Sequence, residues 1–157
     1  MNTKIKKILK KKNKTKILCL TAYSKNFAAE IDKYADITLV GDSLGSVLYN
    51  YDSTTKVTLR NMIDHSRSVR LGVKKSLMVV DMPHNTYKSK SSAYKNAKKI
   101  FKETKCDAVK LEGEKKIINQ INYLIKKKIP VMGHLGLLPQ TAKGKFKSKG
   151  GSVSETK

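Results

Sequence analysis

The sequence predicts an α/β fold with a parallel sheet, and two observations lead to this prediction. Short apolar segments alternate with amphipathic stretches along most of the 157 residues, as in strands joined by crossover helices. No G-x-G-x-x-G motif follows the first expected strand, which disfavours the dinucleotide-binding version of such a fold. An open doubly wound sheet and a closed (β/α)8 barrel are both built from these units, so the pattern alone leaves both open.

The first half of the chain contains two strand–helix units. Residues 16–23 ("KILCLTAY") are apolar and β-branched enough for a buried strand, and 25–35 ("KNFAAEIDKYA") have helical spacing. A second strand is expected at 37–41 ("ITLVG"), and a helix at 59–73 follows Thr58, a suitable N-cap residue. One face of that helix carries Leu59, Met62, Ile63, Ser66 and Val69.

The second half repeats the pattern. A strand is expected at 76–82 ("SLMVVDM"), a helix at 92–102, and a fourth strand at 107–113 ("DAVKLEG"). A helix at 115–127 has apolar residues in register, and the fifth strand falls at 129–137 ("IPVMGHLGL"). Because consecutive strands in such folds are usually neighbours, we expect them to lie in chain order.

The net charge of +22 suggests nucleic-acid binding, but the composition argues against it. Lysine supplies 31 of the 34 basic residues, and arginine, the residue that recognises guanine edges and phosphates, occurs only at Arg60, Arg67 and Arg70. We therefore predict no nucleic-acid partner. No apolar run approaches the ~20 residues of a membrane helix, and no signal peptide is recognisable. Cys19 and Cys106 are too few for a disulfide framework, so we expect a cytoplasmic protein.

Polar side chains recur where the predicted strands end. In parallel α/β folds the carboxyl ends of strands carry the functional groups. Three carboxylates at neighbouring strand ends repel one another unless a proton or cation neutralises them, and an all-oxygen set suits Mg²⁺. The candidate residues are Asp42, Ser43, Asp81, Lys110, Glu112 and His134.

A chelated 2-oxo acid is the natural substrate for such a site. The ion polarises the keto oxygen and stabilises the enolate that forms when the neighbouring carbon loses its proton. Lys110 alternates with Glu112 on one face of its strand and is placed to pair with the substrate carboxylate. His134 is expected to line the site.

Each candidate also has an ordinary structural interpretation. Asp42 by itself is more often a turn or cap residue, and Asp81 before a Met-Pro pair can simply end a strand. Lys110 and Glu112 can form a weak, partly exposed ion pair, and His134 between glycines can be a loop residue. The recurrence at successive strand ends is the reason for preferring a site.

With these residues in place, the chain resembles the ketopantoate hydroxymethyltransferase family. The matching stretches occur in family order at family-like spacing and cover nearly the whole chain after residue 16. They are "LTAY" (20–23), "LVGDSLG" (39–45), "YDST" with "VTL" (51–59), "DMP" (81–83), "VKLEG" (109–113) and "PVMGHLGLLPQ" (130–140).

The resemblance implies a TIM-barrel transferase of the phosphoenolpyruvate/pyruvate superfamily. Such enzymes move a hydroxymethyl group from 5,10-methylenetetrahydrofolate to 3-methyl-2-oxobutanoate, giving 2-dehydropantoate and tetrahydrofolate in pantothenate biosynthesis. Family members assemble as decamers. The Mg²⁺ is associated with positions matching Asp42, Asp81 and Glu112, and the oxo acid with positions matching Asp42, Ser43, Asp81 and Lys110.

The chain also departs from the family pattern. Ser24, His84 and Asn85 replace residues that are more usual there, and the family's general-base glutamate lies on a strand beyond Lys157. A (β/α)8 barrel typically needs about 250 residues. We therefore expect an N-terminal fragment with about five β/α units and severely impaired turnover.

Three segments follow from this expectation. Residues 1–15 are a basic segment that we expect to be helical, 16–142 a partial (β/α) barrel, and 143–157 a disordered polar tail. Two rival functions remain: a noncatalytic lysine-rich protein that binds nucleic acid or other anions, and a Mg²⁺-dependent lyase of the same superfamily acting on another 2-oxo acid.

Overall fold

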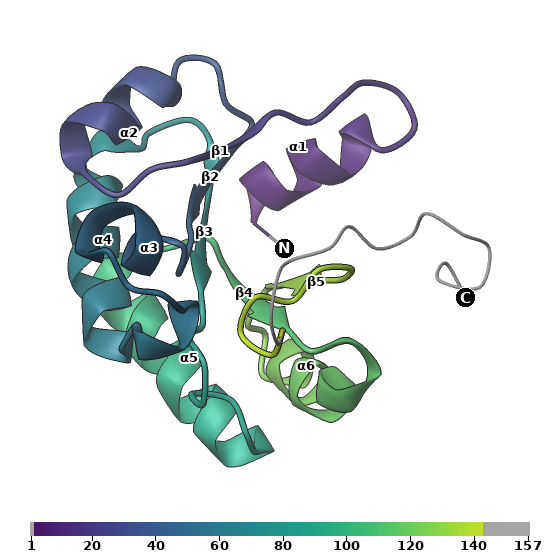
Figure 1. Ribbon diagram of the computed structural model, residues 1–157. Coiled ribbons are helices and arrows are strands. Elements are labelled where there is room, and N and C mark those ends of the chain that lie inside the picture. The colour runs from purple at the N-terminus through teal and green to yellow at the C-terminus, as the bar shows by residue number, and fades with distance from the viewer. Residues whose placement is uncertain (1, 143–157) are drawn as a thin grey trace.

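A curved parallel sheet with helices on its outer side forms the body of the molecule (Figure 1). The computed structural model describes residues 2–142. The strands are β1 (Cys19–Thr21), β2 (Ile37–Val40), β3 (Leu77–Asp81), β4 (Ala108–Glu112) and β5 (Val131–His134). The α-helices are α1 (Thr3–Lys11), α2 (Lys25–Ile31), α3 (Leu44–Tyr49), α4 (Leu59–Gly72), α5 (Lys90–Thr104) and α6 (Ile118–Lys126), and the 3-10 turns are η1 (Thr54–Lys56) and η2 (Glu114–Ile117).

The five strands pair in chain order, β1-β2-β3-β4-β5, and every pairing is parallel. This confirms the predicted parallel α/β sheet. The register places Asp81 opposite Lys110 and Glu112 opposite His134. Four of the predicted site residues are therefore paired across neighbouring strands before any side-chain contact is considered.

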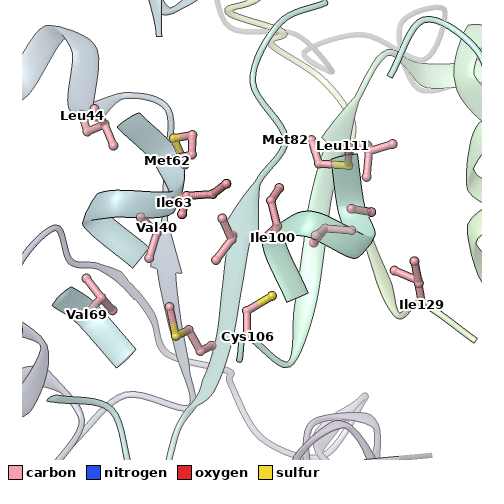
Figure 2. Close-up of a cluster of buried hydrophobic side chains, with 14 of the residues drawn as sticks. Val40, Leu44, Met62, Ile63, Val69, Met82, Ile100, Cys106, Leu111 and Ile129 are labelled. Atoms are coloured by element: carbon pink, nitrogen blue, oxygen red, sulfur yellow. The ribbon is translucent and has the colours of Figure 1, made fainter. Parts of the chain in front are cut away.

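The two faces of the sheet carry separate apolar clusters. Because side chains alternate along a strand, Met78 and Val80 of β3 face the outer helices, whereas Leu77 and Val79 face the inner side. The outer cluster is the larger one, and Figure 2 shows side chains from β2, α4, α5 and β4 meeting in it. The alternation puts Asp81, Lys110 and Glu112 on the inner face.

Helix α1 covers the inner face near the amino ends of the strands, on the opposite side of the sheet from α2 and α4 (Figure 1). Ile5 and Ile8 pack against the inner cluster. Lys11 pairs with Asp36 at 2.6 Å, and Lys4 lies 3.6 Å from Asp107. Both aspartates directly precede a strand, so α1 closes the end of the sheet away from the predicted site.

Most helices match the sequence prediction, but α3 was missed. Its six residues, "LGSVLY", include Gly45, Ser46 and Val47, which are weak helix formers. A tight tertiary contact fixes where this helix lies: a Cβ at Gly45 would be 2.6 Å from Val57 Cγ2. Only glycine lets α3 lie this close to the segment before α4.

The predicted cap of α4 is confirmed. The Thr58 hydroxyl accepts from the Asn61 N–H, and the Asn61 side chain accepts from the Thr58 N–H, which makes a capping box. The other predicted elements differ from the observed ones at their ends; for example, α2 ends at Ile31 and α5 begins at Lys90. The predicted tail at 143–157 lies outside the described residues. Across residues 2–142, none of the helices has the length and apolar character needed to cross a bilayer.

Candidate active site

The predicted site residues gather at the carboxyl ends of β2, β3, β4 and β5. Asp81, Glu112 and His134 are the last residues of their strands, and Asp42 follows β2 by two positions. Asp42, Asp81 and Glu112 are buried, whereas Lys110 and His134 are half-buried. Neighbouring parallel strands thus bring together side chains that lie 22 to 39 positions apart in the sequence.

An ion pair between Lys110 and Asp81 forms the centre of this group. Lys110 Nζ lies 2.9 Å from Asp81 Oδ1, and the Asp42 N–H donates to Asp81 Oδ2 at 3.1 Å. Asp81 Oδ1 is buried, and among the described residues the Lys110 ammonium is the group that lies beside it. This oxygen keeps a lone pair that can also accept a proton or a bound cation.

Burial raises the pKa of all three carboxyl groups. Removal from water raises the pKa of Asp81 to about 7, and Lys110, which acts in the opposite direction, only partly offsets it. Burial also raises the pKa of Asp42 and that of Glu112. The cluster therefore favours neutralisation by a proton or by an additional positive charge.

The side chain of Ser43 does not cap α3, so its hydroxyl can turn toward a ligand. It occupies the N-cap position, yet its side chain makes no cap hydrogen bond. The Ser43 hydroxyl instead lies 2.8 Å from the Tyr23 hydroxyl, just after β1. Tyr23 belongs to the "LTAY" stretch, but strand-end reasoning alone had not marked it as a site residue.

His134 links Lys110 to Glu112. Its Nδ1 lies 3.2 Å from Glu112 Oε2 and 3.5 Å from Lys110 Nζ. Burial lowers the pKa of His134, and the positive charge of Lys110 lowers it further. A neutral imidazole between an ammonium and a carboxylate can donate from one ring nitrogen or accept at it.

Gln140 and Tyr87 are central to the site, and the sequence did not indicate either role. Gln140 Nε2 donates to Asp42 Oδ2 at 2.7 Å and to the Met82 carbonyl at 3.1 Å, while the Gln140 N–H donates to Glu112 Oε1 at 2.6 Å. The Tyr87 hydroxyl lies 2.5 Å from Gln140 Oε1. Both residues come from loops, so no periodic pattern marks them; the only signal was that Gln140 ends "PVMGHLGLLPQ".

The oxygen-rich group has the ligand chemistry of a hard cation, but it contains fewer gathered ligands than predicted. Among residues 2–142, no three His, Cys, Asp or Glu side chains are grouped to hold a metal ion. Glu112 is turned toward Gln140 and His134. Mg²⁺ is often bound by one or two carboxylates and several waters, and Asp42 and Asp81 are suited to that role, so the three-ligand set stays a prediction.

Two departures from the family pattern lie beside this group. His84 and Asn85 line a cavity of about 330 Å³ together with Tyr87, Ile117 and one face of Glu112. Within residues 2–142, no hydrogen bond or ion pair joins either of them to Asp81 or Lys110. The unusual residues thus border the site without replacing its charged members.

Comparison with known proteins decides the family. The family model described as ketopantoate hydroxymethyltransferase matches residues 2–157. The chain belongs to the ketopantoate hydroxymethyltransferase family. It is 66% identical over 157 residues to the 3-methyl-2-oxobutanoate hydroxymethyltransferase of Pelagibacter ubique, which covers all of this chain and 61% of that protein.

A second member of the family shows the same partial coverage. The 3-methyl-2-oxobutanoate hydroxymethyltransferase of Rhizobium etli is 50% identical over 143 residues, or 89% of this chain and 52% of that protein. The chain thus spans between half and two thirds of the length of these relatives.

Solved structures support the fold. A 2,3-dimethylmalate lyase of the PEP mutase/isocitrate lyase superfamily superposes with a TM-score of 0.60 at 12% identity, covering 85% of this chain and 54% of that one. An oxaloacetate acetylhydrolase gives 0.59 at 13% identity, covering 83% and 52%. These identities are informative about the fold alone. Together with the chain's five parallel strands and the helices between them, they identify part of a TIM barrel and confirm the predicted fold class.

Proposed function

We propose that this chain carries the oxo-acid half of a hydroxymethyltransferase site. The reaction joins the one-carbon group of 5,10-methylenetetrahydrofolate to C3 of 3-methyl-2-oxobutanoate, which loses a proton there. Water supplies the hydroxyl, and the products are 2-dehydropantoate and tetrahydrofolate. The observation that carries the proposal is the family match over residues 2–157 together with the charged group at the ends of β2 to β5.

Lys110 is the residue that we propose for the substrate carboxylate. Its ammonium is half-buried, is held by Asp81, and points into the inner side of the sheet. A partly desolvated cation binds a carboxylate more strongly than an exposed lysine does. Ser43 belongs to the same group of residues, and its side chain makes no cap hydrogen bond to α3. Its hydroxyl can therefore donate to an oxygen of the oxo acid.

Asp42 and Asp81 are the residues that we propose to hold Mg²⁺, with Glu112 close by. The ion would polarise the keto oxygen and stabilise the enolate. Asp81 Oδ1 supports this assignment, because it is buried and, within residues 2–142, meets only the Lys110 ammonium. The surrounding residues of the chain hold these carboxylates in place and shield them from water.

The first experiment measures binding and turnover separately. We expect the chain to bind 3-methyl-2-oxobutanoate with Mg²⁺ and to form little 2-dehydropantoate, because the glutamate expected to act as general base is not among its residues. Lys110→Met should weaken oxo-acid binding by about 10- to 100-fold, the magnitude of a charged hydrogen bond. Lys98→Met, an exposed lysine of α5, is the control.

Other outcomes would favour the rival functions. Turnover comparable with that of a full-length relative would contradict the expected impairment. Cleavage of another 2-oxo acid, without exchange of deuterium at C3 of 3-methyl-2-oxobutanoate, would favour a lyase. Salt-dependent binding of DNA at physiological ionic strength, without oxo-acid binding, would favour the lysine-rich anion-binding function.

A further inference from the structure

Gln140 connects three strand ends of the site through one side chain and one backbone amide. Its contacts reach Asp42 after β2, Met82 after β3, and Glu112 at the end of β4. Gln140 is only 6% exposed. A buried amide whose polar atoms are all paired is held rigidly, because each lost partner leaves a costly unpaired group.

The neighbours of Gln140 fix which way its carboxamide points. Asp42 Oδ2 and the Met82 carbonyl are both acceptors, so they require the NH₂ end. The Tyr87 hydroxyl donates its hydrogen, shared between Gln140 Oε1 at 2.5 Å and the Glu112 carbonyl at 2.9 Å. A reversed amide would place an oxygen against two acceptors, and therefore only one orientation is stable.

This orientation separates the carboxylates into two groups. Gln140 holds Oδ2 of Asp42, whose backbone N–H is bonded to Asp81. The Gln140 N–H takes Oε1 of Glu112, and His134 lies beside Oε2 of Glu112. Glu112 is thus engaged on both oxygens, while the two aspartates stay together.

We propose that Gln140 is a positioning residue. It docks the segment after β5 across the strand ends, orients Asp42 beside Asp81, and keeps Glu112 apart from them. The proposal rests on the proposed function in one respect: the aspartate pair that Gln140 orients is the pair assigned there to Mg²⁺ and the oxo acid. Outer partners of this kind typically change metal affinity by about 10- to 100-fold when they are removed.

The test compares four variants of the chain. Gln140→Met keeps the length of the side chain without its hydrogen bonds, Gln140→Asn keeps the amide but is one methylene shorter, and Tyr87→Phe removes the hydroxyl that donates to Gln140 Oε1. Gln120→Met is the matched control, because Gln120 lies on α6 and donates to the Lys88 carbonyl. Each variant is first checked for thermal unfolding, so that loss of fold is recognised.

Two readouts that do not depend on turnover then judge the proposal. The ¹³C resonances of the Asp42 and Glu112 carboxyl groups report their surroundings at fixed pH without metal, and electron paramagnetic resonance measures Mn²⁺ affinity. We expect Gln140→Met and Tyr87→Phe to shift the Asp42 resonance, Gln140→Met to weaken Mn²⁺ binding about 10- to 100-fold, and Gln140→Asn to restore part of it. Gln120→Met should change neither.

The outcomes separate this proposal from the proposed function. Unchanged carboxyl resonances in folded Gln140→Met, or an unchanged or higher Mn²⁺ affinity, would overturn the positioning role. If the parent chain binds neither Mn²⁺ nor 3-methyl-2-oxobutanoate but the Asp42 resonance shifts in Gln140→Met, the proposed function fails and the positioning role is supported.

Discussion

Three buried aspartates of this chain have surroundings that shift their pKa values in opposite directions. Asp32, at the end of α2, accepts hydrogen bonds from the backbone N–H groups of Lys74, Lys75 and Ser76 and from the Ser76 hydroxyl. Asp42 and Asp81 have fewer donors. Burial by itself raises the pKa of each carboxyl group, so the number of donors decides whether the charge is stabilised.

Asp32 should stabilise the fold only where it is ionised. Burial raises its pKa, but the four donors outweigh burial and lower the pKa to about 2. Because the folded state holds the proton more weakly than the unfolded chain, this stabilisation is full above the ordinary value near 3.8 and is lost as the pH falls toward 2. We expect Asp32→Asn to lower the free energy of unfolding at pH 7 by about 2 kcal/mol.

Urea unfolding at pH 7, 5 and 3 checks this prediction. The difference in the free energy of unfolding between the parent and Asp32→Asn should be smaller at pH 3 than at pH 7. Glu30→Gln, at an exposed pair with Lys33, should give nearly equal stability at every pH. If the difference in the free energy of unfolding between parent and Asp32→Asn stays constant from pH 7 to pH 3, the charge of Asp32 contributes nothing to stability.

Asp81 should titrate near neutrality in the metal-free chain. Burial raises its pKa to about 7, and Lys110 lowers it. Removing that positive charge in Lys110→Met should raise the pKa of Asp81 further, whereas Lys98→Met should leave it unchanged. The ¹³C carboxyl resonance, followed against pH with a chelator present, gives both midpoints; a midpoint near 4 in the parent would contradict the prediction.

Asp42, Asp81, Lys110, Glu112 and His134 could be located from the sequence, whereas Gln140 and Tyr87 could not. Strand ends are visible as the limits of apolar runs, and parallel pairing then places their polar residues side by side. Gln140 acts partly through its backbone N–H, a group that every residue except proline carries. The roles of these strand-end residues, as metal ligands, substrate contacts or site-lining groups, stay predictions.

At the scale of elements, α4 was predicted almost to the residue, whereas α3 was missed. Thr58 and the spacing of Met62, Ile63 and Val69 are local signals. The position of helix α3 depends instead on a tertiary contact between Gly45 and Val57, which are close in space but separated in the sequence. Local patterns contain no record of such a contact, and the weak helix formers of α3 hide it further.

The packing of α4 on α2 depends on Gly72, the last residue of α4. A Cβ there would lie 2.3 Å from the Lys25 carbonyl oxygen and 2.7 Å from the Ala29 nitrogen. Both are backbone atoms, so the two helices would have to separate. We expect Gly72→Ala to lower the free energy of unfolding by about 1 to 3 kcal/mol.

Chemical denaturation of Gly72→Ala and of Gly133→Ala measures this effect. At Gly133 of β5, an added Cβ would have none of the atoms described for residues 2–142 within 4 Å, so this variant should change stability by no more than about 0.5 kcal/mol. Equal effects of the two variants would show that α2 and α4 can separate at little cost.

At the scale of the whole molecule, α1 and the site close opposite ends of one sheet. Ile5 and Ile8 of α1 cover the inner apolar cluster near the amino ends of the strands. In the sequence, the many lysines of this segment indicate only a strong positive charge. The apolar face of the segment packs on this cluster, and its lysines Lys11 and Lys4 pair with Asp36 and Asp107. The segment therefore has a structural role.

Ile8→Ala should therefore destabilise the molecule although it lies far from the site. Losing the partly buried side chain is expected to cost about 1 to 2 kcal/mol, whereas Leu9→Ala, whose side chain is 55% exposed, should cost less than about 0.5 kcal/mol. Thermal unfolding of both variants measures the difference. If Leu9→Ala is the more harmful, α1 packs through another face.

The hydrogen bond between Gln140 and Asp42 joins residues 98 positions apart, and this separation has a consequence for synthesis. A ribosome adds roughly 5 to 20 residues per second, so β2 and β3 leave it several seconds before Gln140 does. During that time Asp42 and Asp81 exist without the amide that orients them. The first three strands can pair as they emerge, but Asp42 gains its contact with Gln140 only afterwards.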